Sequence, residues 1–388
     1  MNRFWALIDA TARPEAAAVV RVVVGAAAVL KALERAPVLD RLSDPTILRV
    51  PYVVGQPSLA DLPPMLVLAV WVGLAAAFAA GAATRVTGSA LTALLLGVAF
   101  SDQQLYSNHL YLMAWLVGLL TFADAGAALS VDALGRGRRL IAAAPLWLLR
   151  TQISVVYLFA GLSKINLEYM SGSVVALNLR RDGVLAIPAE WRGFELMATF
   201  ALISIVLEIW LAIALWLPRW RRTAFVFGLG LHVTLALWFE PPLQLIVFGM
   251  IMLAPYVLFL DLGPRPVTVV FDDSCGFCKR WIKWFGRFDW LRVLEFIPSS
   301  DGAELARLDV PRADADRALQ LVGHRRRVEG FDAVIGVLER LPISMLWAPL
   351  LRLWPILPIG RRAYARVAAR RQCSINPGSP SGAGAEAE

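Results

Sequence analysis

The sequence predicts a polytopic α-helical membrane bundle of about eight spans, followed by a C-terminal α/β domain of the thioredoxin-like class. The first observation is composition: 58% of the 388 residues are hydrophobic and 18% are charged, whereas soluble proteins carry about 45–50% apolar and about 25% charged residues. The second is that apolar stretches long enough to cross a bilayer recur as far as residue 262. The third is that the three cysteines, Cys275, Cys278 and Cys373, follow these stretches. We therefore expect neither thiol chemistry nor a disulfide framework in the membrane part.

Eight apolar segments are predicted to span the membrane. They are residues 15–33, 63–81, 87–105, 108–125, 145–163, 196–217, 223–240 and 243–262. The segment 34–62 contains four prolines and is not expected to form one helix. Residues 126–144 form a basic connector, whereas residues 165–195 are too polar to span and are expected to lie along the interface.

The arginines predict the orientation of these spans. When the N-terminus is placed inside, the inner side collects nine arginines and the outer side six, which agrees with the positive-inside rule. We therefore expect a multi-pass protein of a bacterial-type inner membrane, surrounded by membrane lipid, with both termini in the cytoplasm. The net charge of +8 lies in short clusters between apolar runs, so we expect no nucleic-acid partner. Pro14 and Arg21 interrupt the apolar core that a signal peptide needs, so we expect the N-terminal segment to be retained.

The chain changes character after Leu262. We divide it into a membrane domain (1–262), a linker (263–266), an α/β domain (267–372) and a disordered tail (373–388). Expected elements of the α/β domain are a buried strand at 267–271, a basic amphipathic helix at 279–288, a strand at 291–297, a strand with a tight turn near Gly323 over 318–328, and a helix at 330–339. Residues 341–362 are apolar and rich in proline, and are expected to dock on a membrane surface.

Ionisable residues at membrane depth are candidates for a functional site. Lys164 ends an apolar segment, and a cation at membrane depth costs about 2.5–3.5 kcal/mol unless it reaches the interface or a polar cavity. Two of the three histidines, His109 and His232, also lie in predicted spans. In the predicted topology, Lys164 and His109 lie at the outer end and His232 near the middle, so all three could face one cavity. A histidine, or the free amine of a desolvated lysine, can act as a base.

The alternative for each of these residues is structural. Lys164 could be an interfacial anchor, His109 could cap its span, and His232 could bond a neighbouring helix. Three further charged residues, Arg21, Arg150 and Glu208, are expected to pair with one another.

Several short motifs of the membrane domain resemble a known family. They are Asn108-His109 with Tyr111 and Leu112, residues 121–126, residues 160–165, and a histidine in a late span followed by residues 248–253. In this order they are similar to the HTTM domain, which is shared with the vitamin K-dependent gamma-carboxylases. The resemblance implies that Lys164 is the base on a pathway that oxygenates a reduced quinone of the menaquinone or vitamin K type. It implies that His109 supports this step, with Asn108 and His232 as supporting residues.

Two departures from the carboxylases change the expected substrate. The animal enzymes have two adjacent lysines where this chain has Ser163 and Lys164. They also carry a large domain that recognises a propeptide, which is not apparent here. We therefore expect chemistry on a membrane quinol or another lipid-soluble or peptide substrate rather than carboxylation of glutamate.

Cys275 and Cys278 form the second candidate site. The motif Asp272-Asp273-Ser274-Cys275-Gly276-Phe277-Cys278 directly follows a predicted strand and begins a predicted helix. The helix N-terminus and the following basic residues stabilise a thiolate on Cys275, and Cys278 lies one turn on, where it can resolve a mixed disulfide. Half of a zinc site is the alternative, but His324 and Cys373 lack ligand spacing, so we expect no metal and assign neither residue a role.

This motif and the basic segment near residues 360–371 resemble the DCC family of thiol-disulfide oxidoreductases over residues 266–372. The resemblance implies that Asp272 is the leading aspartate, Cys275 the exposed cysteine and Cys278 the resolving cysteine. An unidentified thiol or disulfide protein is the implied partner.

The sequence thus predicts a membrane-bound thiol-disulfide oxidoreductase joined to a gamma-carboxylase-like membrane domain. With the predicted orientation, the cysteines and Lys164 lie on opposite membrane faces, so the two domains are expected to act on different steps. In a rival reading, the bundle is a non-catalytic maturation factor or chaperone for an exported peptide, beside a separate redox module. In another, the C-terminal domain binds a partner without cycling its cysteines.

Overall fold

The computed structural model describes residues 10–372 apart from positions 54, 56–57, 135, 137–138, 182–186, 261–265, 324–326, 342 and 345–346. The chain forms two compact units, Met1–Asp261 and Leu262–Glu388, which we call the membrane unit and the C-terminal unit. His324, Cys373 and the tail predicted at 373–388 lie outside the described residues, as does most of the predicted linker.

The membrane unit contains a helix at each of the eight predicted segments. They are α2 (Glu15–Ser43), α3 (Pro64–Ala80), α4 (Thr84–Ser101), α5 (Asn108–Phe122), α6 (Ala144–Ser163), α9 (Phe194–Ala214), α10 (Arg221–Trp238) and α11 (Pro242–Leu253), which continues as the 3-10 helix η5 (Ala254–Phe259). Between α6 and α9 lie the short helices α7 (Leu167–Met170) and α8 (Ser173–Asn178). A two-residue strand β1 (Thr11–Ala12) pairs antiparallel with β2 (Ile141–Ala142).

Helix α2 is longer than the sequence predicts. The predicted span ends at residue 33, but α2 continues through Pro37 to Ser43. A proline removes one backbone hydrogen bond and bends a helix, but it does not end the helix when packing holds both sides. Arg35, Leu39 and Leu42 are all buried on this continuation, so tertiary packing explains the difference.

Among the described residues, five helices are long and apolar enough to cross a membrane, which supports a membrane protein. They are Glu15–Ser43, Thr84–Ser101, Ala144–Ser163, Phe194–Ala214 and Pro242–Phe259, while α3 and α5 are apolar but shorter. Eight crossings, and the orientation of the termini, stay predictions.

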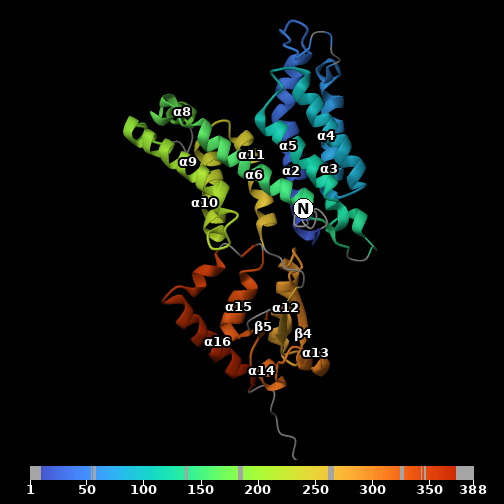
Figure 1. Ribbon diagram of the computed structural model, residues 1–388, viewed down its shortest axis with the longest axis vertical. Coiled ribbons are helices and arrows are strands. Elements are labelled where there is room, and N and C mark those ends of the chain that lie inside the picture. The colour runs from blue at the N-terminus through green and yellow to red at the C-terminus, as the bar shows by residue number, and fades with distance from the viewer. Residues whose placement is uncertain are drawn as a thin grey trace, which may run out of the picture. The chain divides into compact units, whose positions relative to one another are not determined.

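Helix packing divides the membrane unit into two groups (Figure 1). Helix α2 packs on α3, α3 on α4 and α4 on α5, while α6 packs on α9 and α9 on α10. Helix α11 packs on both α10 and α2 and thereby joins the groups. This arrangement brings the start of α5, the end of α6 and the start of α11 to one end of the unit.

The C-terminal unit contains a four-stranded mixed sheet in the order β4-β3-β5-β6. Its strands are β3 (Val267–Phe271), β4 (Leu294–Pro298), β5 (Gln320–Val322) and β6 (Arg327–Glu329). Strand β3 runs parallel to β4 and antiparallel to β5, and β5 pairs antiparallel with β6, which confirms the strand pair predicted over 318–328. The unit's helices are α12 (Gly276–Phe288), α13 (Gly302–Arg307), α14 (Arg312–Arg317), α15 (Gly330–Leu338), the 3-10 helix η6 (Ala348–Arg352) and α16 (Ile356–Gln372).

Two details of this unit differ from the prediction. The second strand begins at Leu294 and not at Leu291, because the Asp289 carboxylate accepts the backbone N–H groups of Val293 and Leu294 and holds a turn there. The six-residue helices α13 and α14 were not predicted, since segments this short show no apolar period.

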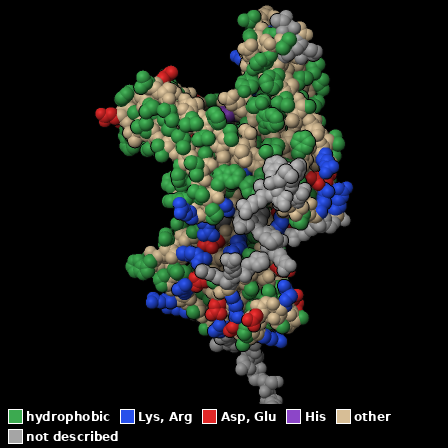
Figure 2. All heavy atoms as spheres, viewed as in Figure 1, with side chains coloured by type: hydrophobic (Ala, Val, Ile, Leu, Met, Phe, Trp, Pro, Cys, Tyr) green, Lys and Arg blue, Asp and Glu red, His purple; other side chains and the backbone are tan. Residues whose placement is uncertain are grey.

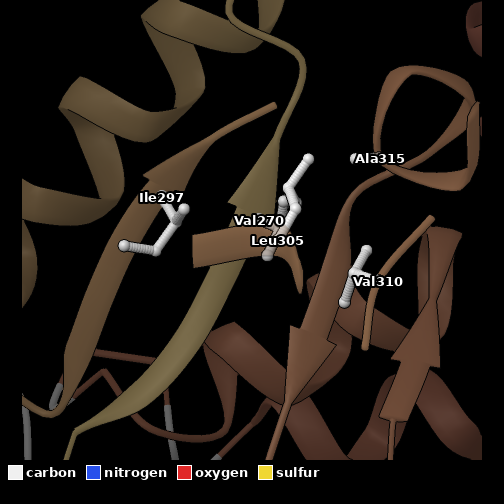
Figure 3. Packing of buried hydrophobic residues seen from close by; sticks show 5 residues of the cluster. All are labelled: Val270, Ile297, Leu305, Val310 and Ala315. Carbon is white, nitrogen blue, oxygen red and sulfur yellow. The ribbon is translucent and has the colours of Figure 1, made fainter. Parts of the chain in front are cut away.

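Packing against the sheet fixes the position of β3. Val269 and Val270 are both fully buried, as expected for a central strand covered on both faces. Val270 belongs to a cluster with Ile297, Leu305, Val310 and Ala315 (Figure 3). The strand that leads into the cysteine motif is therefore anchored in the core.

Replacing Leu305 by alanine should destabilise the C-terminal unit by about 2–5 kcal/mol, because its side chain is buried and a cavity would remain. The measurement is pulse proteolysis of the full-length protein in a urea series. Leu350→Ala is the matched control, since Leu350 is 54% exposed, and should change stability by less than about 0.5 kcal/mol. Equal effects of the two substitutions would contradict the assignment of this core.

Candidate functional site

The cysteine motif lies where the sequence places it, between β3 and α12. Cys275 is the N-cap residue of α12 and is partly exposed, whereas Cys278 is buried one turn into the helix. The unpaired backbone N–H groups and the dipole at the start of a helix favour a negative charge placed there. The position of Cys275 therefore suits a thiolate.

Two aspartates hold the loop that precedes α12. The buried Asp272 carboxylate accepts hydrogen bonds from the backbone N–H and the hydroxyl of Ser274, at 2.9 and 2.6 Å. The Asp273 carboxylate accepts from the hydroxyls of Ser299 and Ser300 and from the Ser300 backbone N–H. Asp273 thus ties the loop after β3 to the loop after β4. The sequence singled out Asp272 but not Asp273, although its place next to a cysteine motif was a usable signal.

Asp272, Cys275 and Cys278 also come close enough to be compared with a metal site. One ligand atom from each lies within 4.8 Å of the other two. A structural zinc needs four ligands, and over the described part of the chain no fourth His, Cys, Asp or Glu joins the group. The geometry therefore fits a dithiol better than a structural zinc site.

An apolar cavity of about 330 Å³ opens beside Cys278. Its walls come from α12, α15 and α16, with aromatic side chains prominent among them. They include Phe277, Trp281, Phe285, Phe331 and Tyr364. A group bound there would contact Cys278, and the apolar walls would favour an apolar group.

In the membrane unit, Lys164 and Glu208 form an ion pair. The Lys164 Nζ lies 2.5 and 2.6 Å from the two carboxylate oxygens of Glu208. The Glu208 side chain is 7% exposed and that of Lys164 is 25% exposed. Lys164 also lies 5.4 Å from the ring centre of Tyr169, a cation–π distance. The partner of Glu208 is therefore Lys164, and the expected pairing of Glu208 with Arg21 or Arg150 is wrong.

The glycine in the motif around Lys164 has a packing role. A Cβ on Gly161 would lie 2.7 Å from the Ile209 side chain and 3.2 Å from the Ile205 carbonyl oxygen on α9. Close helix contact in membranes depends on such small residues. Gly161 therefore lets α6 approach α9, and this approach brings Lys164 to Glu208.

Arg21 and Arg150 have partners other than Glu208. Arg21 donates hydrogen bonds to four backbone carbonyls, those of Ala79, Ala125, Ala128 and Leu129. Arg150 lies over the rings of Trp147 and Phe259. Both arginines thus hold helices and loops together.

His232 belongs to a buried hydrogen-bonded chain. Its Nε2 lies 2.8 Å from the Tyr157 hydroxyl, which lies 2.8 Å from the Tyr256 hydroxyl. A Cβ on Gly228, one turn from His232 on α10, would overlap the Tyr256 hydroxyl. Sequence reasoning missed both tyrosines, because only the packing of α6, α10 and η5 brings them to His232.

His109 joins this region through a shared aromatic ring. The His109 ring stacks on Phe248 at 4.2 Å between centres, and His232 meets the same ring edge-on at 5.3 Å. His109 and His232 therefore lie on opposite sides of one contact, the Phe248 ring, whereas the printed contacts of Lys164 are with Glu208 and Tyr169. Asn108 is exposed at the first residue of α5, away from these contacts.

Family comparisons agree with the two units. Residues 10–263 match the HTTM domain and residues 269–374 match the DCC1-like thiol-disulfide oxidoreductase family. The protein thus combines a membrane domain with a redox-type domain. It belongs to the HTTM domain family and carries a C-terminal DCC1-like domain, as the motifs predicted. No solved structure matches the chain.

Hydrogen bonding sets the acid response of the loop at Asp273. Desolvation opposes ionisation of this carboxyl, but hydrogen bonds from Ser300 and Ser299 outweigh it and lower its pKa below the ordinary value. A carboxyl with a lowered folded-state pKa stabilises the fold above the unfolded value, and this contribution is lost as the pH falls through the folded-state pKa.

Asp273→Asn should therefore lower the thermal unfolding midpoint of the C-terminal unit above about pH 5, and the difference from wild type should vanish well below about pH 4. The measurement is the unfolding midpoint of both proteins across pH 3–7. A difference that stays constant over this range would refute the role of the charged carboxylate.

Proposed function

We propose that this protein is a membrane-bound thiol-disulfide oxidoreductase whose C-terminal unit has a thioredoxin-like fold. The order β4-β3-β5-β6, with parallel β3 and β4 joined by α12, supports this fold. The observation that carries the function is the position of the two thiols, with Cys275 partly exposed at the start of α12 and Cys278 buried behind it.

The reaction needs no group beyond the dithiol and a partner disulfide. The Cys275 thiolate attacks one sulfur of the partner disulfide, forming a mixed disulfide and releasing a partner thiolate. The Cys278 thiolate then attacks Cys275 Sγ, which releases the second partner thiolate and leaves a Cys275–Cys278 disulfide. The dithiol loses two electrons and the partner gains them. The apolar cavity beside Cys278 favours a partner that carries apolar groups next to its disulfide.

Cys278→Ser should trap the mixed disulfide, because the attacking thiol remains and the resolving thiol is gone. Cys275→Ser should trap little or none. Both variants are made with Cys373→Ser, so that no third thiol contributes, and adducts are counted by non-reducing gels and mass spectrometry after expression in cells. If Cys275→Ser traps an adduct and Cys278→Ser does not, Cys275 is not the attacking thiol.

For the membrane unit, we propose proton abstraction from a lipid-soluble substrate at Lys164, with a reduced quinone as the substrate class. The Lys164–Glu208 pair supports this role. A lysine acts as a base only as the free amine, and the Glu208 carboxylate, 2.5 Å from Lys164 Nζ, is placed to accept a proton from it. In this proposal, the free amine of Lys164 forms after its proton passes to Glu208.

A cavity next to this pair could accommodate the apolar part of such a substrate. It has a volume of about 440 Å³, lies between α8, α9 and α10, and has Tyr169 and Ser204 in its wall. Tyr169 is the residue whose ring lies beside Lys164, and its hydroxyl hydrogen-bonds to Ser204 at 3.0 Å. The buried His232–Tyr157–Tyr256 chain is a candidate route for protons released there.

Lys164→Ala should abolish oxygenation of a reduced quinone by the purified protein, because the proposed base is lost, while Cys275→Ser should leave it intact. The assay adds reduced menaquinone and oxygen to anaerobically purified protein and detects a quinone epoxide by mass. If wild type forms no epoxide, the likeness to the carboxylases is one of fold. Epoxide from Lys164→Ala at the wild-type rate would rule out this lysine as the base.

A further inference from the structure

A second cluster of charges lies on α2, inside the membrane unit. Lys31, Glu34 and Arg35 stand at positions i, i+3 and i+4 of the helix, so their side chains share one face. The Lys31 side chain is fully buried, that of Arg35 is 9% exposed, and that of Glu34 is 14% exposed. No part of the proposed chemistry uses these residues.

The charges of this cluster do not balance. Both cations approach the same carboxylate oxygen, Glu34 Oε2, with Lys31 Nζ at 2.6 Å and Arg35 Nε at 3.3 Å. These contacts lack hydrogen-bond geometry, so over the described residues neither Lys31 Nζ nor Arg35 Nε has a hydrogen-bond acceptor. Over the described residues, Glu34 is the carboxylate that forms an ion pair with Lys31 and with Arg35. One positive charge and several donors are thus left uncompensated, which is costly at such a depth.

His109 extends this cluster toward the surface. Helix α5 packs on α2, and His109, the second residue of α5, is partly exposed. The His109 Nδ1 lies 3.4 Å from the Gln244 amide nitrogen. If Nδ1 accepts from that amide, Nε2 carries the proton and is a further donor. Figure 2 shows the membrane unit hollowed between its two helix groups, with a histidine surface exposed near the base of the hollow.

We propose that Lys31, Arg35 and His109 form a binding site for one oxyanion, reached from this hollow. An oxyanion with a single negative charge would neutralise the excess positive charge and accept hydrogen bonds from the unused donors. The planar guanidinium of Arg35 matches a carboxylate or phosphate in a bidentate contact. The oxyanion could come from a small free anion or from the headgroup of an anionic lipid, since both present the same oxygens. This site goes beyond the proposed reaction, because anion binding requires neither turnover nor the dithiol.

The test measures thermal unfolding of the full-length protein in an uncharged detergent after lipid removal. Sodium acetate, inorganic phosphate and phosphatidylglycerol are titrated separately against sodium chloride at equal ionic strength, with acetamide as the uncharged analogue of acetate. Ligands that bind only the folded state raise the unfolding midpoint. We expect at least one oxyanion to raise it, and acetamide not to. A response to acetate or phosphate indicates a free anion, and a response to phosphatidylglycerol alone indicates a lipid headgroup.

Three variants separate anion binding from a structural role. Arg35→Gln should weaken binding by about tenfold or more, whereas Glu34→Gln should strengthen it several-fold, because the competing internal carboxylate is removed. Arg41→Gln, at an exposed position in the last turn of the same helix, is the matched control and should bind as wild type does. If Arg35→Gln does not fold, Glu34→Gln carries the test. The site is disproved if no oxyanion stabilises the wild type, or if Glu34→Gln binds no more tightly.

Discussion

Compensation of buried charge is the constraint on which the membrane unit depends. An isolated ion inside an apolar bundle is so costly that helices must pack where each charge finds a partner. Lys164 finds Glu208 on another helix, at 2.5 Å. Arg21 instead finds four carbonyl oxygens where other helices end. These contacts set which helices are neighbours, and Gly161 allows the approach that the first of them needs. The cluster on α2 is the place where this compensation is incomplete, and therefore where a ligand is expected.

The C-terminal unit solves a different problem, that of presenting one thiol while protecting another. Strand β3 is anchored in the core through Val270, and this holds the first residue of the following loop in place. Asp273 then ties that loop to the end of β4 through Ser299 and Ser300. The start of α12 is thereby held in place, with Cys275 partly exposed and Cys278 buried. A redox dithiol needs this difference, because only one sulfur should meet the partner first.

The two units offer complementary chemistry for a protein at the membrane. The C-terminal unit offers two cysteines for the proposed thiol-disulfide exchange, and the membrane unit contains two histidines, a lysine–glutamate pair and two tyrosine hydroxyls in apolar surroundings. Both candidate sites adjoin apolar cavities, beside Cys278 and beside Tyr169. Substrates or partners with apolar groups therefore suit both sites, which agrees with a protein that works within and next to lipid.

Features that depend on local chemistry could be predicted from the sequence. The eight helices were found because apolar runs of this kind are visible in a hydropathy window. The cysteine motif was found because a strand, a turn and a helix follow one another closely in the chain. Lys164, His109 and His232 were found because charge is rare in such runs. Tertiary structure alone decided that Glu208 is the partner of Lys164, that Tyr157 and Tyr256 extend from His232, and that Lys31 and Arg35 are buried. The reason is physical: hydropathy gives the length of a helix but not its neighbours, and every one of these contacts joins helices distant in the chain or depends on which face of a helix is covered.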